Sequence, residues 1–221
     1  MRTAQTAFFD LDKTVFGINS GFKWLLSEWR KGHIKHRQAL KGVIGLMRYT
    51  AGADDLGGLI EGAIRDYEGL PEAVLASRTR IFFREQVEWT IRAEARSQID
   101  LHRRLGHKCV ILTTSSQYMC ESVREVLPFD DHLCTVLEAQ EGNLTGRTVQ
   151  GVCFGEGKLA AMTHLLARKG ERLEDSFFYT DSYSDRPGLA AVGYPRVVCP
   201  DRKLRQFALR AGWPILEWGP E

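Results

Sequence analysis

Short apolar runs alternate with longer amphipathic stretches along most of this chain. Continuous apolar runs are typical of strands that are buried on both faces of a parallel sheet. Five runs are expected to be strands: residues 6–9, 109–113, 133–137, 177–180 and 197–199. A helix is expected over 158–168, and a polar, glycine-containing excursion over 138–151. The alternation predicts an α/β fold, a Rossmann-like parallel sheet with helices on both faces.

The pattern changes between residues 19 and 87, where helical periodicity continues without a clear strand. Breaks are expected at Gly32, at residues 51–55 and at Gly69-Leu70-Pro71. We therefore expect an all-helical cap inserted into the sheet domain. The predicted division is a core of residues 1–15 and 89–221 and a cap of residues 16–88.

Composition narrows the class of protein. A chain of 221 residues can bury a sizeable core without disulfides. The net charge of +2 gives no electrostatic argument for a nucleic-acid partner. Five scattered cysteines, an odd number, favour reduced thiols in a cytoplasmic protein. The cysteines are Cys109, Cys120, Cys134, Cys153 and Cys199.

A membrane span and a secretory leader are not expected. The apolar run 42–47 is far shorter than the roughly 18 residues that cross a bilayer, and Asp10 interrupts the apolar stretch near the start. The basic segment 30–37 is typical of a solvated helix face. Because Trp24 and Trp29 lie near it, peripheral contact with an anionic membrane surface is the alternative. A monomer and a homodimer both stay open.

Four small polar clusters follow strands or begin helices. They are Asp10-Leu11-Asp12-Lys13-Thr14, Thr113-Thr114-Ser115-Ser116, Lys158 behind Gly155-Glu156-Gly157, and Thr180-Asp181-Ser182-Tyr183-Ser184-Asp185. Parallel strands end along one edge of a sheet, so the clusters should converge there. Two crowded carboxylates at that edge are unfavourable unless a cation offsets them. The alternative for Asp10 and Asp12 is a structural role in a turn or a helix cap.

In this order, the four motifs resemble those of the haloacid dehalogenase superfamily, and more narrowly its phosphoserine phosphatase-like branch (subfamily IB). That branch has an Asp-x-Asp-x-Thr first motif, a helical cap directly after it, and Gly-Asp-Ser-x-x-Asp as its fourth motif. The resemblance covers essentially the whole chain. It implies a magnesium-dependent phosphomonoester hydrolase that acts on a small phosphorylated metabolite through an aspartyl-phosphate intermediate.

The resemblance also implies a role for individual residues. Asp10 would be the nucleophile, Asp12 the acid that protonates the leaving oxygen and then activates water, and Lys158 the cation that holds the phosphoryl group. Substrate binding is expected of Thr114, Ser115 and Ser20. Mg²⁺ prefers oxygen ligands, here Asp10, the backbone carbonyl of Asp12, and Asp181. The supporting residues are Asp185, which would orient Lys158 or the metal's water shell, and Thr14, which would shape the loop by hydrogen bonding.

Three features depart from the branch's pattern, and one of them is Lys13, which replaces the smaller residue common in phosphoserine phosphatases. Phosphoserine phosphatases place a glutamate shortly after the first motif to meet the substrate's amine, whereas this chain has Asn19 and Ser20 there. Threonine also stands at position 180, where glycine is usual. Phosphoserine-like esters and lipid head-group phosphates therefore both stay open as substrates. Asp12 favours phosphatase over dehalogenase chemistry, because a halide leaves without a proton. A phosphotransferase or mutase, and a catalytically silent binding module, are the alternative functions.

Overall fold

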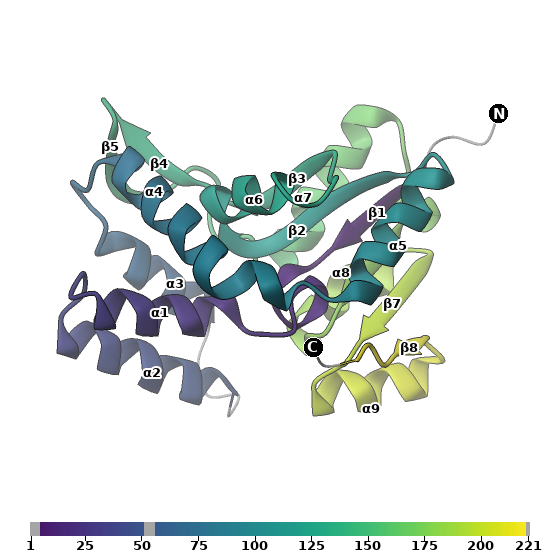
Figure 1. Cartoon of the computed structure of the whole chain (residues 1–221). Coiled ribbons are helices and arrows are strands. Elements are labelled where there is room, and N and C mark those ends of the chain that lie inside the picture. Colours follow the sequence, from purple (N-terminus) through teal and green to yellow (C-terminus); the bar gives the residue numbers. More distant parts are fainter. Residues whose placement is uncertain (1–4, 51–55, 220–221) are drawn as a thin grey trace.

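The computed structural model describes residues 5–50 and 56–219, which form a six-stranded parallel sheet with helices on both faces (Figure 1). The strands are β1 (Thr6–Phe9), β2 (Lys108–Ser116), β3 (Asp131–Thr135), β6 (Phe177–Thr180), β7 (Tyr194–Val198) and β8 (Ile215–Leu216). Their order across the sheet is β3-β2-β1-β6-β7-β8. The predicted α/β fold is confirmed, and β1 lies in the middle of the sheet, between β2 and β6.

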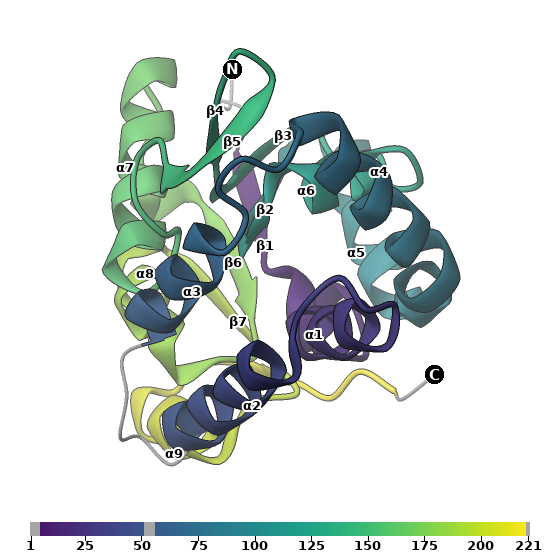
Figure 2. The same cartoon turned by 90° about the vertical axis from the view of Figure 1, so that its left-hand side faces the viewer.

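Side chains of β1 alternate between two apolar layers. Ala7 and Phe9 face the layer that contains α5 (Ala93–Arg104) and α6 (Gln117–Arg124). Phe8 faces α7 (Glu156–Lys169), α8 (Arg186–Ala191) and α9 (Arg202–Ala211). Figure 2 shows α5 and α6 on one side of the sheet and α7 and α8 on the other. Because both faces are covered, β1 is an apolar run without polar alternation.

The inserted helices gather at one end of the molecule, at the left of Figure 1. They are α1 (Ser20–Arg30), α2 (His36–Thr50), α3 (Leu56–Arg65) and α4 (Glu72–Phe82). Phe16 and Ile91 form an antiparallel bridge, so the chain leaves and re-enters the core at neighbouring positions. Gly32 follows α1 with a φ of 72°, and Gly69-Leu70-Pro71 precedes α4. The break expected at 51–55 lies outside the described residues.

The sequence did not predict one pair of strands. The polar, glycine-containing excursion expected over 138–151 contains most of an antiparallel hairpin, β4 (Leu137–Gln140) with β5 (Asn143–Thr148), outside the main sheet. The predicted strand 133–137 covers the end of β3 and only the first residue of β4. The turn is possible because Glu141 and Gly142 adopt φ values of 52° and 80°. The hairpin is then held from outside, since Gly69 N donates to Leu144 O at 2.8 Å.

No helix in the described part of the chain is long and apolar enough to cross a membrane. The basic segment lies at the end of α1 and the start of α2, where Trp29 Nε1 donates to His36 Nδ1 at 2.9 Å. Trp29 is partly exposed, while Trp24 packs against Phe82 inside the inserted helices. Contact of this segment with a membrane surface stays a prediction.

Candidate active site

Asp10 lies at the carboxyl end of the central strand. Its backbone N donates to Tyr179 O of β6 at 2.9 Å, which fixes the residue between two parallel strands. The chain then turns through Leu11–Val15, where Lys13 has a φ of 57°. A lysine in this left-handed region is strained. The turn makes it possible for Asp10 and Asp12 to lie close together at the edge of the sheet.

Asp12 is held by the start of α1. Its Oδ1 accepts the backbone N–H of Ser20 at 2.9 Å, and the Ser20 hydroxyl and the Gly21 N–H also hydrogen-bond to the carboxylate. Burial raises the pKa of Asp12, and these hydrogen bonds oppose the shift. Ser20 is buried and directed at Asp12, so the structure gives it a contact that orients the carboxylate. Its expected role in substrate binding stays a prediction.

Lys158 joins two of the sequence clusters in one buried ion network. Its Nζ lies 2.7 Å from Asp10 Oδ1 and 2.8 Å from Asp185 Oδ2. All three side chains are almost fully buried, with 4%, 9% and 1% of their surfaces exposed for Lys158, Asp10 and Asp185. The turn before α7 is tight, because a Cβ on Gly157 would lie 2.8 Å from Val152 O. Glycine at 157, the second residue of α7, therefore permits the close approach of the preceding loop to the helix, next to Lys158.

The protonation of this network follows from burial and charge. Burial raises the pKa of Asp10 to about 7, although the neighbouring Lys158 works against this shift. For Lys158, burial favours the neutral amine, but Asp10 and Asp185 together overcome burial and raise its pKa. The ammonium therefore stays charged, as a compact cation between two carboxylates.

Asp181 adds a third carboxylate to the same edge. It is buried at the end of β6, and both burial and the nearby Asp10 raise its pKa well above the ordinary value. Its backbone carbonyl accepts Asp201 N at 2.9 Å, which anchors the loop after the strand. Asp185 Oδ1 is buried and has no hydrogen-bond partner among the described residues. Carboxyl groups therefore outnumber cations at this edge.

These observations fit a hard divalent cation. Within residues 5–50 and 56–219, no three His, Cys, Asp or Glu side chains are grouped as a metal site. Mg²⁺, however, usually takes one or two carboxylates and keeps several waters. Asp10, Asp181 and the carbonyl of Asp12 supply such a set, and the unpartnered Asp185 Oδ1 is an acceptor suited to a water of the ion. The donor chemistry fits magnesium.

The second cluster lies on the neighbouring strand, β2. Thr114 and Ser115 are half-buried, and the Thr114 hydroxyl donates to Cys153 O at 3.0 Å. Thr113 is buried, and its Oγ1 accepts Ser115 N at 3.2 Å. The Thr114 proton is thus engaged by the protein itself, and binding a phosphate oxygen would require this bond to open. Phosphate binding by Thr114 and Ser115 stays a prediction.

Sequence reasoning missed two contacts and expected one that does not form. Thr180 donates its hydroxyl to Asp185 Oδ2 at 2.6 Å, which orients the carboxylate that holds Lys158. Asp201 accepts Tyr183 N at 2.8 Å and also caps α9; its place just before a helical pattern was the available signal. Thr14 is buried, but its hydroxyl has no partner in the described part of the chain, so the expected loop-shaping hydrogen bond is absent.

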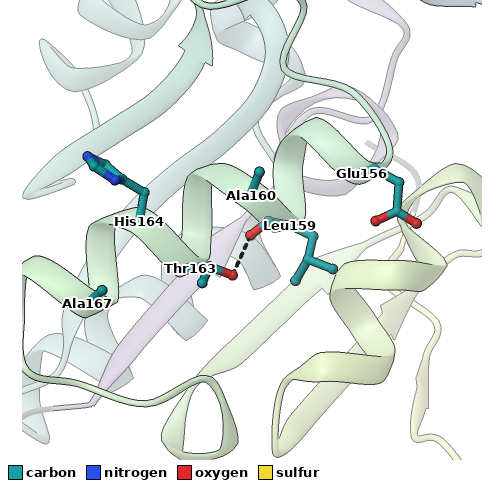
Figure 3. Close-up of a pocket in the computed structure, with 6 residues that line it drawn as sticks. All are labelled: Glu156, Leu159, Ala160, Thr163, His164 and Ala167. Atoms are coloured by element: carbon teal, nitrogen blue, oxygen red, sulfur yellow. Dashed lines mark hydrogen bonds between the residues drawn. The ribbon is translucent and has the colours of Figure 1, made fainter.

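A separate hollow lies along the outer side of α7. Figure 3 shows the residues that line it. They are Glu156, Leu159, Ala160, Thr163, His164 and Ala167. None of the predicted site residues belongs to this hollow, although Lys158 lies on the same helix and is buried. The carboxylate network at the sheet edge is therefore the candidate active site.

Known proteins are similar to this chain over most of its length, including the candidate active site. A family model described as haloacid dehalogenase-like hydrolase matches residues 7–190, a range that contains Asp10, Lys158 and Asp181. The chain is 30% identical to a probable phosphatase of Mycobacterium tuberculosis, over 98% of this chain and 76% of that protein. It is 26% identical to a histidinol-phosphatase of Neisseria meningitidis, over 96% and 98%. A solved structure of a Bordetella pertussis protein of unknown function has a TM-score of 0.88 at 26% identity, covering 97% of this chain and 99% of that one.

Proposed function

Because the chain belongs to the haloacid dehalogenase-like hydrolase family and its relatives include phosphatases, we propose that it is a magnesium-dependent phosphomonoester hydrolase acting through phosphorylated Asp10. The family resemblance inferred from the motifs is confirmed, and the protein is a hydrolase of phosphate esters. The observation that carries the finer proposal is the buried contact of Asp10 with Lys158, beside Asp181.

In the first step, Asp10 attacks the phosphorus of the ester. A phosphate monoester is a dianion, so a carboxylate can approach it only where positive charge is fixed nearby. Lys158 supplies that charge, and Asp185, itself oriented by Thr180, holds the ammonium in position. When magnesium is bound by Asp10, Asp181 and the carbonyl of Asp12, it supplies further charge for the phosphoryl oxygens.

Asp12 moves the proton in both steps. It donates a proton to the leaving alcohol oxygen while Asp10 takes the phosphoryl group, and then takes a proton from the water that hydrolyses the acyl phosphate. Ser20 and the first N–H groups of α1 fix the carboxylate for both transfers. These donors lie at the start of α1, the first inserted helix. The orientation of the Asp12 carboxylate therefore depends on the position of that helix.

The inserted helices are proposed to select the substrate. Asn19 Oδ1 accepts Phe22 N at 2.8 Å, so the side chain at this position caps α1 and offers no carboxylate to an amine. This geometry supports a small phosphorylated metabolite other than phosphoserine itself. Lipid head-group phosphates are one class to test first. The name of the Neisseria relative adds phosphorylated amino alcohols, whose amine would need a partner other than residue 19.

The cellular setting is part of the proposal. All five cysteines are free thiols, and this supports a reducing compartment such as the cytoplasm. The proposed partners are a small-molecule phosphate ester and Mg²⁺, and both a monomer and a homodimer are compatible with the proposal.

A phosphate-release screen tests the proposal. The purified protein with Mg²⁺ is assayed for free phosphate from phosphorylated amino acids, amino alcohols, sugars, nucleotides and lipid head groups, beside Asp10→Asn. We expect one class to be hydrolysed by the wild type and none by the variant. Phosphate found on an added alcohol would indicate a phosphotransferase. A folded protein that hydrolyses no ester would overturn the proposal in favour of a binding module.

A further inference from the structure

The outward side of α2 is apolar. Gly42 and Gly45 face inward, because a Cβ on them would lie 2.8 Å from a side chain of α1 and 2.7 Å from a side chain of α3, respectively. Leu40 and Ile44 are four residues apart and lie on the opposite side of the helix, where 60% and 46% of their surfaces are exposed. Two large aliphatic side chains thus point away from the neighbouring helices, at positions where polar residues are usual.

The C-terminal helix α9 has a similar arrangement. Leu204 and Ala208 are buried in the apolar layer that covers one face of the sheet. Arg202 and Leu209 are seven residues apart, and both lie on the opposite side of the helix. Arg202 is exposed, and so is 70% of the Leu209 surface. The outward side of α9 therefore presents an aliphatic side chain in line with a cation.

The two outward sides face the same side of the molecule. Figures 1 and 2 both place α2 and α9 along the lower side. In Figure 1, α1 lies above α2, and β7 lies above α9. Since the inward sides of α2 and α9 pack toward these elements, their outward sides face downward together. One helix is inserted and the other belongs to the core, so a flat partner can contact both parts of the protein.

Positive charge is concentrated on these two helices. Neither contains Asp or Glu, whereas Lys and Arg recur in both, although the whole chain has 30 Lys and Arg against 28 Asp and Glu. Lys35, Arg37 and Arg202 are exposed and form no ion pair with another described residue. Arg205 is paired with Glu217. The exposed basic and aliphatic residues are together called the α2–α9 face: Lys35, Arg37, Leu40, Ile44, Arg202 and Leu209.

Trp29 lies next to this face. Its Nε1 donates to His36 Nδ1 at 2.9 Å, and the two rings meet edge to face with centroids 5.7 Å apart. His36 comes four residues before Leu40 on α2, so Trp29 lies near the aliphatic residues of that helix. An indole ring has an apolar body and a polar N–H, and such rings are enriched at the interface between membrane and water.

We propose that the α2–α9 face binds an anionic lipid surface peripherally. Its cations lie among the lipid phosphates, and its aliphatic side chains enter the boundary between the head groups and the acyl chains. Neither helix crosses the bilayer. The proposal does not depend on the hydrolysis of a phosphate ester, so it stands or fails separately from the proposed function.

The chemistry of the face favours lipid over other partners. Nucleic acids also carry phosphates, but their backbone offers no apolar layer for Leu40, Ile44 and Leu209. A second copy of the chain would set two basic faces against each other, which is unfavourable. An anionic lipid surface accommodates both the cations and the aliphatic side chains.

Flotation of the purified full-length protein with lipid vesicles tests the proposal. Vesicles of phosphatidylglycerol and phosphatidylcholine are compared with vesicles of phosphatidylcholine alone. We expect at least about tenfold tighter binding to the anionic vesicles, because each Lys or Arg near such a surface contributes about fivefold. Added NaCl should weaken this binding, since salt screens the charges. Equal binding to the two kinds of vesicle, or binding to neither, would overturn the proposal.

Charge-reversal variants separate the face from the overall charge of the protein. Arg37→Glu and Arg202→Glu should each weaken binding to the anionic vesicles by at least about tenfold. Lys169→Glu is the matched control, because it changes the net charge equally and alters an exposed residue at the end of α7, which lies above α2 and α9 in Figure 2. The control should bind as the wild type does. An equal loss in all three variants would overturn the proposal.

A double variant identifies the kind of partner. Leu40→Ser combined with Ile44→Ser leaves the charge unchanged and should weaken vesicle binding several-fold, because the aliphatic contacts are lost. Thermal unfolding of each variant checks that it is folded. If duplex DNA is bound more tightly than the vesicles, and equally by the wild type and the double variant, the face is a nucleic-acid site and the proposal is overturned.

Discussion

The described residues form two buried carboxylate–cation networks, one at the edge of the sheet and one among the inserted helices. At the sheet edge, Lys158 is 4% exposed and contacts Asp10 and Asp185, both nearly inaccessible. Among the inserted helices, Glu28 is equally buried at 2%, but its partners His33 and Arg78 are 28% and 27% exposed. A hollow of ≈ 220 Å³ between α1 and α4 is lined by these three residues.

The balance of charge separates the two networks. Glu28 is one carboxylate between Arg78 and a histidine, so its charge is offset by side chains of the protein. Asp10, Asp181 and Asp185 have only Lys158 between them as a buried cation in the described part of the chain. Since both networks are buried, burial alone does not indicate catalysis. The excess of carboxyl groups over cations distinguishes the sheet edge, because carboxylates without matching cations are available as ligands for a metal ion.

Removal of magnesium should have the largest effect. Chelation with EDTA should lower phosphatase activity by roughly 10³-fold or more, because charge at the sheet edge is then no longer offset. Added Mg²⁺ should restore activity and raise the thermal midpoint of the wild type by mass action. Asp181→Asn should lose the thermal response, while Arg78→Met should keep it. An equal response in all three proteins would place the ion elsewhere.

Removal of the cation should have very different effects on the two networks, and this difference should be the second largest effect. Lys158→Met leaves two buried carboxylates without a cation, so activity should fall by about 10²-fold or more and unfolding should become easier by about 3 kcal/mol. Arg78→Met should cost about 1 kcal/mol and leave the activity within a few-fold, since water can reach Glu28 through the hollow. Steady-state kinetics and urea unfolding check both variants. Similar losses of activity and stability in the two variants would contradict the difference between the two networks.

Acid should weaken the protein through His102, which lies outside both networks. His102 is buried and hydrogen-bonds to Tyr179 and His107, and burial lowers its pKa to about 4. The unfolded chain therefore binds more protons between about pH 6.5 and pH 4. The free energy of unfolding should fall across this window by about 1.4 kcal/mol per pH unit. Urea unfolding at several pH values, with His102→Phe as the insensitive control, separates this effect from those of the networks.

Neutralising the Glu28 network should have the smallest effect. Glu28→Gln keeps the size of the side chain and one acceptor, so the expected loss of stability is about 1 kcal/mol, without a change in kcat or in the response to Mg²⁺. Chemical denaturation measures the loss of stability, and kinetics at saturating substrate measure kcat with and without added Mg²⁺. A large fall in kcat would show that this network also serves the reaction.

The two networks also differ in how far the sequence could predict them. Asp10, Lys158 and Asp181 follow strands or begin a helix, and strand order alone brings such residues to one edge. Glu28 and Arg78 lie 50 residues apart on two helices, and their contact depends on how those helices pack. Side-chain partners inside the site were equally hidden: the bonds of Thr180 to Asp185 and of Thr114 to Cys153 depend on atomic geometry. The β4–β5 hairpin was missed because its strands are polar and short, and tertiary contacts support them.

The central claim is that Asp10 carries the phosphoryl group during turnover. Rapid acid quenching of the protein with Mg²⁺ and a ³²P-labelled substrate, followed by peptide mapping, tests it directly. The label should appear on the peptide that contains Asp10, should be released by hydroxylamine as an acyl phosphate is, and should be absent from Asp10→Asn. Turnover without a covalent label, or a label on another residue, would contradict the account.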